Sequence, residues 1–183
     1  MSTLAPAPTL QRLSTARRFA VEKVDRAARV IRGLSVITRG EALGHGFWID
    51  REAVAQIQAL GSAKSRGIKS RLAHPSLCAD GAGTFLGRMA GFRLSGDQAF
   101  ADLSFSEVTK RCPQYPNDPA EWVMDMAEKE PDMAGLSIVF DADRGEMDRF
   151  AADDEDEKGR FISPDPDNKD NLPHIRFAAL AAI

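Results

Sequence analysis

Apolar and polar residues alternate in several short runs, which predict β-strands. Residues 28–38 are rich in β-branched side chains and predict the first strand. Two alternating runs, 85–94 and 98–105, are joined by a Ser-Gly-Asp turn and predict a hairpin. Further strands are expected at 136–141 and, as the last element, at 174–183.

Apolar residues at helical spacing predict two helices between these strands. The first begins after Asp50, whose carboxylate can cap it, and runs to about Leu60. The second covers about 119–129 and begins with a proline, a favoured first helical residue. Strands interrupted by two or three helices, without regular βαβ alternation, predict an α+β fold with a small antiparallel β-barrel or closed sheet.

The 183 residues are enough for one domain of ordinary size. Residues 1–20 contain two prolines and no sustained period, which predicts a flexible leader ahead of a folded domain at 21–183. Within that domain the acidic run 153–157 lies between glycines. We therefore expect a mobile, solvated insert at about 146–170.

The formal net charge of −3 argues against direct binding to nucleic acid, but the charge is unevenly distributed. The first 40 residues carry eight basic and two acidic side chains, whereas residues 141–170 carry twelve acidic and five basic ones. No apolar run approaches the roughly 18 residues that cross a bilayer, and the N-terminus lacks the apolar core of a signal peptide. A soluble, intracellular protein is expected.

Two segments carry residues suited to nucleophilic catalysis. Leu72-Ala73-His74-Pro75 offers an imidazole base, and Ser137 follows small residues at the start of an expected strand. A serine hydroxyl is a poor nucleophile until a neighbouring base removes its proton. By pattern alone, His74 could equally end a strand as a half-buried imidazole, and Ser137 could be a small polar residue of a sheet.

The order of the segments resembles a known family. An apolar stretch ends in His74, Leu86-Gly87-Arg88 opens a hairpin, a helix follows, and Gly135-Leu136-Ser137 begins a strand. This set, from about 68 to 140, resembles the prohead (head-maturation) proteases of tailed bacteriophages, whose fold and catalytic serine are shared with the herpesvirus assemblins. The resemblance implies an assemblin-like fold in which Ser137 attacks the peptide carbonyl and His74 takes and returns the proton.

The resemblance also implies a third catalytic group, on the strand after the serine strand. His174 is the candidate, and the alternative is a solvent-facing histidine at a strand edge. Period-two alternation predicts that Arg176 and Ala178 share its outward face, with Ile175, Phe177 and Ala179 in the core. The resemblance also implies a backbone oxyanion hole just past this strand; its donors are expected either from elsewhere in the chain, for example near Arg88, or from residues beyond Ile183.

By resemblance, the protein is a serine endopeptidase that cleaves scaffold or capsid-protein extensions, and often itself, inside the prohead assembling in the host cytoplasm. No cofactor is needed. The implied partners are the scaffold protein, the major capsid protein and a second copy of the chain, because assemblins are activated by dimerisation. The alternative is a catalytically incomplete assembly or scaffold module with the same fold.

Other candidate residues favour structural interpretations. His45 has no partner at ligand spacing, so no metal site is expected there. Cys78 lies four residues after His74, but no cysteine-protease signature surrounds it. Two cysteines, Cys78 and Cys112, are too few for a disulfide framework. Core positions are expected for the following aromatic residues: Trp48, Trp122, Phe85, Phe92, Phe100 and Phe105.

Overall fold

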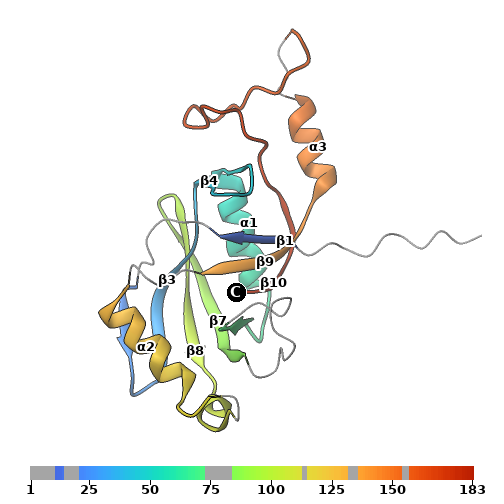
Figure 1. The fold of residues 1–183 in the computed structure, drawn as a ribbon. Helices are drawn as coiled ribbons and strands as arrows, with labels where there is room; N and C mark the ends of the chain where they lie inside the picture. Colours follow the sequence, from blue (N-terminus) through green and yellow to red (C-terminus); the bar gives the residue numbers. More distant parts are fainter. Residues whose placement is uncertain (1–10, 15–20, 73–83, 113–114, 132–135, 154–156) are drawn as a thin grey trace, which may run out of the picture.

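The computed structural model describes residues 11–14, 21–72, 84–112, 115–131, 136–153 and 157–183. Its main feature is an eight-stranded sheet in the order β1-β9-β10-β6-β7-β8-β3-β2 (Figure 1). The strands are β1 (Gln11–Ser14), β2 (Lys23–Asp25), β3 (Val30–Thr38), β6 (Ile68–Arg71), β7 (Phe85–Ser95), β8 (Gln98–Phe105), β9 (Ser137–Ala142) and β10 (Phe177–Ala182). A second sheet pairs β4 (Gly40–Ala42) with β5 (Phe47–Ile49).

The sheet is open, so the expected barrel is wrong. Among the described residues, its two edges are β1 and β2, which pair with β9 and β3 respectively and not with each other. Closure would need the edges to meet with a matching stagger, and strands of four and three residues offer little length for this pairing. The sheet is also mixed, because β10 and β6 run parallel. The coarser expectation of an α+β fold is confirmed.

The predicted hairpin forms the middle of the sheet as β7 and β8, which pair from Ser95↔Gln98 to Gly87↔Phe105. Gly87 has a packing role here. A Cβ at this position would lie 2.1 Å from the carbonyl oxygen of Ser104, so only glycine allows the two backbones to approach this closely. The adjacent Leu86 is buried in the core.

Both predicted helices are present. The first, α1 (Arg51–Ser62), begins at the Asp50 cap, whose side chain accepts a hydrogen bond from the Ala53 amide. Its buried face packs across β7, β10 and β8. The second, α2 (Pro119–Lys129), lies against β2 and the 3₁₀ helix η1 (Glu107–Arg111). Trp122 on α2 is 55% exposed, so its expected core position is wrong.

A third helix, α3 (Arg144–Asp153), occupies part of the region expected to be a solvated loop. Asp143 caps it by accepting a hydrogen bond from the Glu146 amide. The following stretch, 160–174, is not a helix, yet it carries internal hydrogen bonds and a buried Asn168. The described parts of 146–170 therefore have local structure, and the mobility expected for this insert stays a prediction; the run 154–156 lies outside the described residues.

The two chain ends also differ from expectation. Within the expected leader, Gln11–Ser14 form β1 and pair with β9, while the rest of 1–20 lies outside the described residues. The final strand begins at Phe177 instead of at His174, which makes only an isolated bridge to Trp48. In the described parts of the chain, no helix combines the length and apolar character needed to span a membrane.

Candidate functional site

Ser137 is the first residue of β9, as expected, and its side chain is partly buried. β9 runs antiparallel to β10, with Val139 opposite Ala182 and Ala142 opposite Phe177. Ser137 therefore lies at the C-terminal end of β10. It pairs with Ser14 of β1 on its other side.

His74 lies outside the described residues, but the strand that leads to it is described. β6 runs parallel to β10, with Lys69 opposite Ala182, and the Arg71 amide donates to the Ile183 carbonyl at 3.1 Å. The C-terminal end of β6 thus lies beside the C-terminal end of β10. Because β9 is antiparallel to β10, the beginning of β9 lies at this same end of the sheet.

His174 precedes the first residue of β10, Phe177, which pairs with Ala142 of β9. It therefore lies at the opposite end of β10 from Ser137. Five residue steps along β9 separate Ala142 from Ser137, roughly 17 Å at the usual strand rise. The structure therefore does not bring His174 together with Ser137. The expected accessibility is also wrong, because His174 and Arg176 are each only 2% exposed. The burial predicted for Ile175 and Phe177 is confirmed.

Asp50 is the group that holds His174 and Arg176 inside the protein. Its Oδ2 lies 2.6 Å from His174 Nδ1, and Arg176 donates to both carboxylate oxygens at 2.9 and 3.1 Å. The same carboxylate caps α1 through the Ala53 amide. One partly buried anion thus compensates a buried guanidinium and orients a buried imidazole.

The other ring nitrogen of His174 faces a serine. Ser163 Oγ lies 2.7 Å from Nε2, and the Asn168 side-chain nitrogen lies 3.4 Å from the same atom. Phe150 stacks on the imidazole with its ring centroid at 4.6 Å. Asp50, His174 and Ser163 therefore form a continuous hydrogen-bonded chain from carboxylate to imidazole to hydroxyl.

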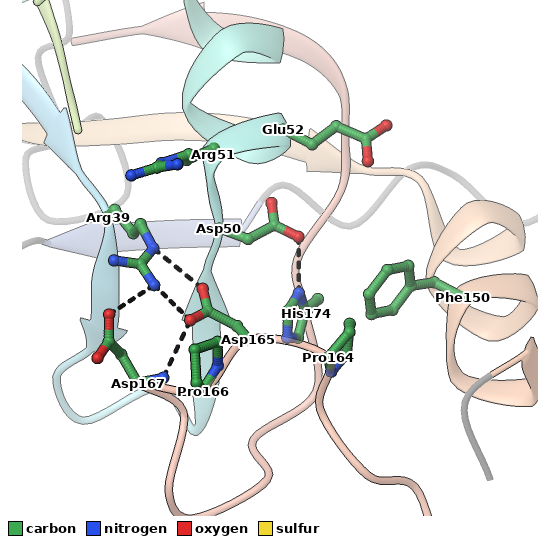
Figure 2. A pocket seen from close by; sticks show the side chains of 10 residues that line it. All are labelled: Arg39, Asp50, Arg51, Glu52, Phe150, Pro164, Asp165, Pro166, Asp167 and His174. Carbon is green, nitrogen blue, oxygen red and sulfur yellow. Dashed lines mark hydrogen bonds and ion pairs between the residues drawn. The ribbon is translucent and has the colours of Figure 1, made fainter. Parts of the chain in front are cut away.

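A cavity of about 490 Å³ opens beside this chain of side chains. Figure 2 shows Asp50 and His174 joined by their hydrogen bond, with Phe150 beside the imidazole. Across the cavity, Arg39 is paired with Asp165 and Asp167. The lining residues are Arg39, Asp50, Arg51, Glu52, Phe150, Pro164, Asp165, Pro166, Asp167 and His174.

Asp50 is strongly biased toward its ionised form. Burial alone would raise its pKa, but hydrogen bonds from His174, the Ala53 amide and Arg176 act in the opposite direction. Together they lower the pKa of Asp50 from its ordinary value of 3.8 to about 2. The carboxylate is therefore a hydrogen-bond acceptor at any pH well above 2.

This pKa predicts an acid-labile part of the protein's stability. A carboxyl group with a depressed folded-state pKa stabilises the fold above its unfolded pKa, and that contribution is lost as the pH falls from about 4 to about 2. The loss should be about 2 kcal/mol, at 1.36 kcal/mol per pKa unit. Urea unfolding measured at pH 5 and pH 2.5 should show a smaller difference for Asp50→Asn than for wild type. Equal differences would contradict the prediction.

Two further candidates from the sequence, Arg88 and His45, lie neither at the Ser137 end of the sheet nor beside the Asp50–His174–Ser163 chain. Arg88 lies on β7 and donates to the Gly67 carbonyl at 3.3 Å, which directs it toward the beginning of β6 and away from the Ser137 end. His45 is exposed in the β4–β5 turn. Within the described residues, no three His, Cys, Asp or Glu side chains are grouped as metal ligands.

Sequence reasoning identified Asp50 only as a helix cap and gave no role to Ser163. The reason is distance along the chain, since 113 positions separate the two residues and no motif links them. Comparisons with protein-family models, with curated proteins and with solved structures find no match for this chain.

Proposed function

We propose that the protein is a serine endopeptidase of the prohead-protease type, with Ser137 as the nucleophile and His74 as the general base. Its substrates are extensions of the scaffold and major capsid proteins, and the chain itself, inside the prohead assembling in the host cytoplasm. Ser137 Oγ would form a bond to the peptide carbonyl carbon while its proton passes to His74. The imidazole would then return that proton to the leaving amine.

The proposal is supported chiefly by the shared sheet end at which β6 finishes and β9 begins. Only β10 separates the two strands, so their ends lie about two strand spacings, or roughly 10 Å, apart. His74 follows Arg71 by three residues, and three extended residues span up to roughly 10 Å. The chain is therefore long enough for an imidazole at 74 to reach the Ser137 hydroxyl.

A serine-directed fluorophosphonate tests the nucleophile directly. Trypsin should release residues 130–144 as one peptide whose only serine is Ser137. We expect the phosphonate adduct on this peptide in the wild-type protein and its loss in His74→Ala, because the hydroxyl needs its base.

Two outcomes would contradict this assignment. Peptide 130–144 could stay unmodified in a folded wild-type protein, or it could be modified equally in His74→Ala. Either result would favour the non-enzymatic assembly module, in which the sheet is kept and the catalytic pair does not function.

A further inference from the structure

We infer that Ser163 is a second nucleophilic serine, activated by His174 and Asp50, which accepts acyl groups from short-chain esters that enter the adjoining cavity. The inference does not depend on the proposed function, since its residues lie at the other end of β10 from Ser137. It rests on the order of the three side chains, on the atoms through which they meet, and on the cavity.

The contacts use the ring nitrogens that nucleophile activation requires. Asp50 lies on Nδ1 at 2.6 Å and Ser163 lies on Nε2 at 2.7 Å. In serine hydrolases the carboxylate orients the imidazole through Nδ1–H, and Nε2 takes the serine proton. The same three residue types occur here in the same order.

The surrounding hydrogen bonds fix the direction of this chain. The Asp50 carboxylate can only accept, so Nδ1 carries the hydrogen. The amide of Asn168 is oriented by Leu172, whose N–H donates to Oδ1 and whose carbonyl accepts from Nδ2. The Asn168 NH₂ group therefore faces Nε2 as a donor, and Nε2 lies at hydrogen-bond distance from the Ser163 hydroxyl, the position from which it would take the Ser163 proton.

Ser163 adjoins the cavity through its neighbours. Its side chain is partly buried, and the next residue, Pro164, lines the 490 Å³ cavity together with His174 and Asp50. Phe150 packs on the imidazole and holds its plane. Arg39 and Arg51 line the same cavity, and each is paired with a carboxylate: Arg39 with Asp165 and Asp167, and Arg51 with Asp97.

The reaction is a balanced acyl transfer. Ser163 Oγ forms a bond to the ester carbonyl carbon as its proton moves to His174 Nε2; the bond from that carbon to the alkoxy oxygen breaks, and the alcohol leaves with the proton. Water then attacks the acyl-serine, gives a proton to Nε2, and releases the carboxylic acid as Ser163 recovers its hydrogen. The net change is ester plus water to acid plus alcohol.

A single digest can separate this site from Ser137. Trypsin should release residues 161–169 as a peptide whose only serine is Ser163, distinct from peptide 130–144. Peptide 94–110 contains Ser95, Ser104 and Ser106 and serves as an internal control for ordinary serine reactivity. After brief treatment with fluorophosphonate or p-nitrophenyl acetate, peptide 161–169 should carry the adduct at least roughly tenfold faster than peptide 94–110.

Variants and denaturation then test activation. Ser137→Ala should leave modification of 161–169 unchanged, whereas His174→Gln should reduce it at least roughly tenfold. Because His174 is buried and its variant could unfold, the wild-type protein is also treated in urea, where modification of 161–169 should fall to the level of 94–110. Modification of 161–169 no faster than the control in the folded protein, or undiminished in urea, would overturn the inference. Neither result bears on peptide 130–144, so the proposed function stands or falls separately.

Discussion

Ser137→Ala is expected to abolish self-cleavage, with a fall in rate of at least roughly 10³-fold. A nucleophile cannot be replaced by the rest of a catalytic group, so its removal costs nearly as much as the removal of the whole group. The free energy of unfolding should change by less than about 1 kcal/mol, because the Ser137 side chain is only partly buried. Intact mass of the purified chain over time measures cleavage, and urea unfolding measures stability.

Ser104→Ala is the matched control, since Ser104 is an exposed strand serine at the other side of the sheet, on β8. It should leave the intact-mass time course unchanged. A Ser137→Ala chain that still shortens at the wild-type rate would remove Ser137 from the mechanism. Equal losses in Ser137→Ala and Ser104→Ala would instead point to a general effect on the fold.

Much of the sheet could be predicted because its signals are local. Residues 28–38, 85–94 and 98–105 alternate or carry β-branched side chains, and the structure has strands at Val30–Thr38, Phe85–Ser95 and Gln98–Phe105. The openness of the sheet could not be predicted this way, since closure depends on whether distant edge strands meet.

The third helix was missed because acidic composition outweighed a weaker periodic signal. Residues 144–153 have a cap at Asp143, and the apolar residues Met147 and Phe150 are spaced three apart. Phe150 packs on His174, and Met147 packs against the core. Two apolar contacts and a cap thus produced a helix where like charge predicted a loop.

One basic residue of the N-terminal part pairs with the acidic stretch 141–170. Arg39, from the basic N-terminal part, pairs with Asp165 and Asp167 of the acidic stretch, and Trp48 donates its ring N–H to Asp165 at 2.9 Å. The charge asymmetry was visible in the sequence, but its pairing was not. Compensation of this kind allows 160–174 to pack on the domain despite its charge.

Part of the candidate site could be predicted from the sequence and part could not. Ser137 could be placed at a strand start because its flanking residues carry that signal, and the structure has β9 beginning there. The role of His174 could not be predicted, since period-two alternation applies only within a strand and β10 begins three residues later. Outside the strand, its orientation is set by Asp50, which is 124 positions away.

Arg176→Met is expected to lower the free energy of unfolding by about 3–5 kcal/mol, the range for a buried charge that loses its partner. Arg176 is 2% exposed and donates to Asp50, to Glu52 at 3.1 Å and to the Ile175 carbonyl at 2.8 Å. Its guanidinium also lies 4.6 Å from the centre of the Phe150 ring. Methionine fills much of the volume but leaves the Asp50 carboxylate with fewer donors.

The control is Arg51→Met, which removes an arginine–aspartate pair of similar length from the surface. Arg51 Nε lies 2.8 Å from Asp97, but the arginine side chain is 78% exposed, so the expected cost is about 0–1 kcal/mol. Adding Asp50→Asn to Arg176→Met should cost less than the sum of the two single changes, because the second removes the charge that the first left unpaired. Urea unfolding of the four variants and wild type measures all of these terms. If Arg176→Met cost no more than Arg51→Met, the hydrogen bonds between Arg176 and Asp50 would not be what holds the start of β10 to the start of α1. The orientation of His174 would then come from its packing against Phe150.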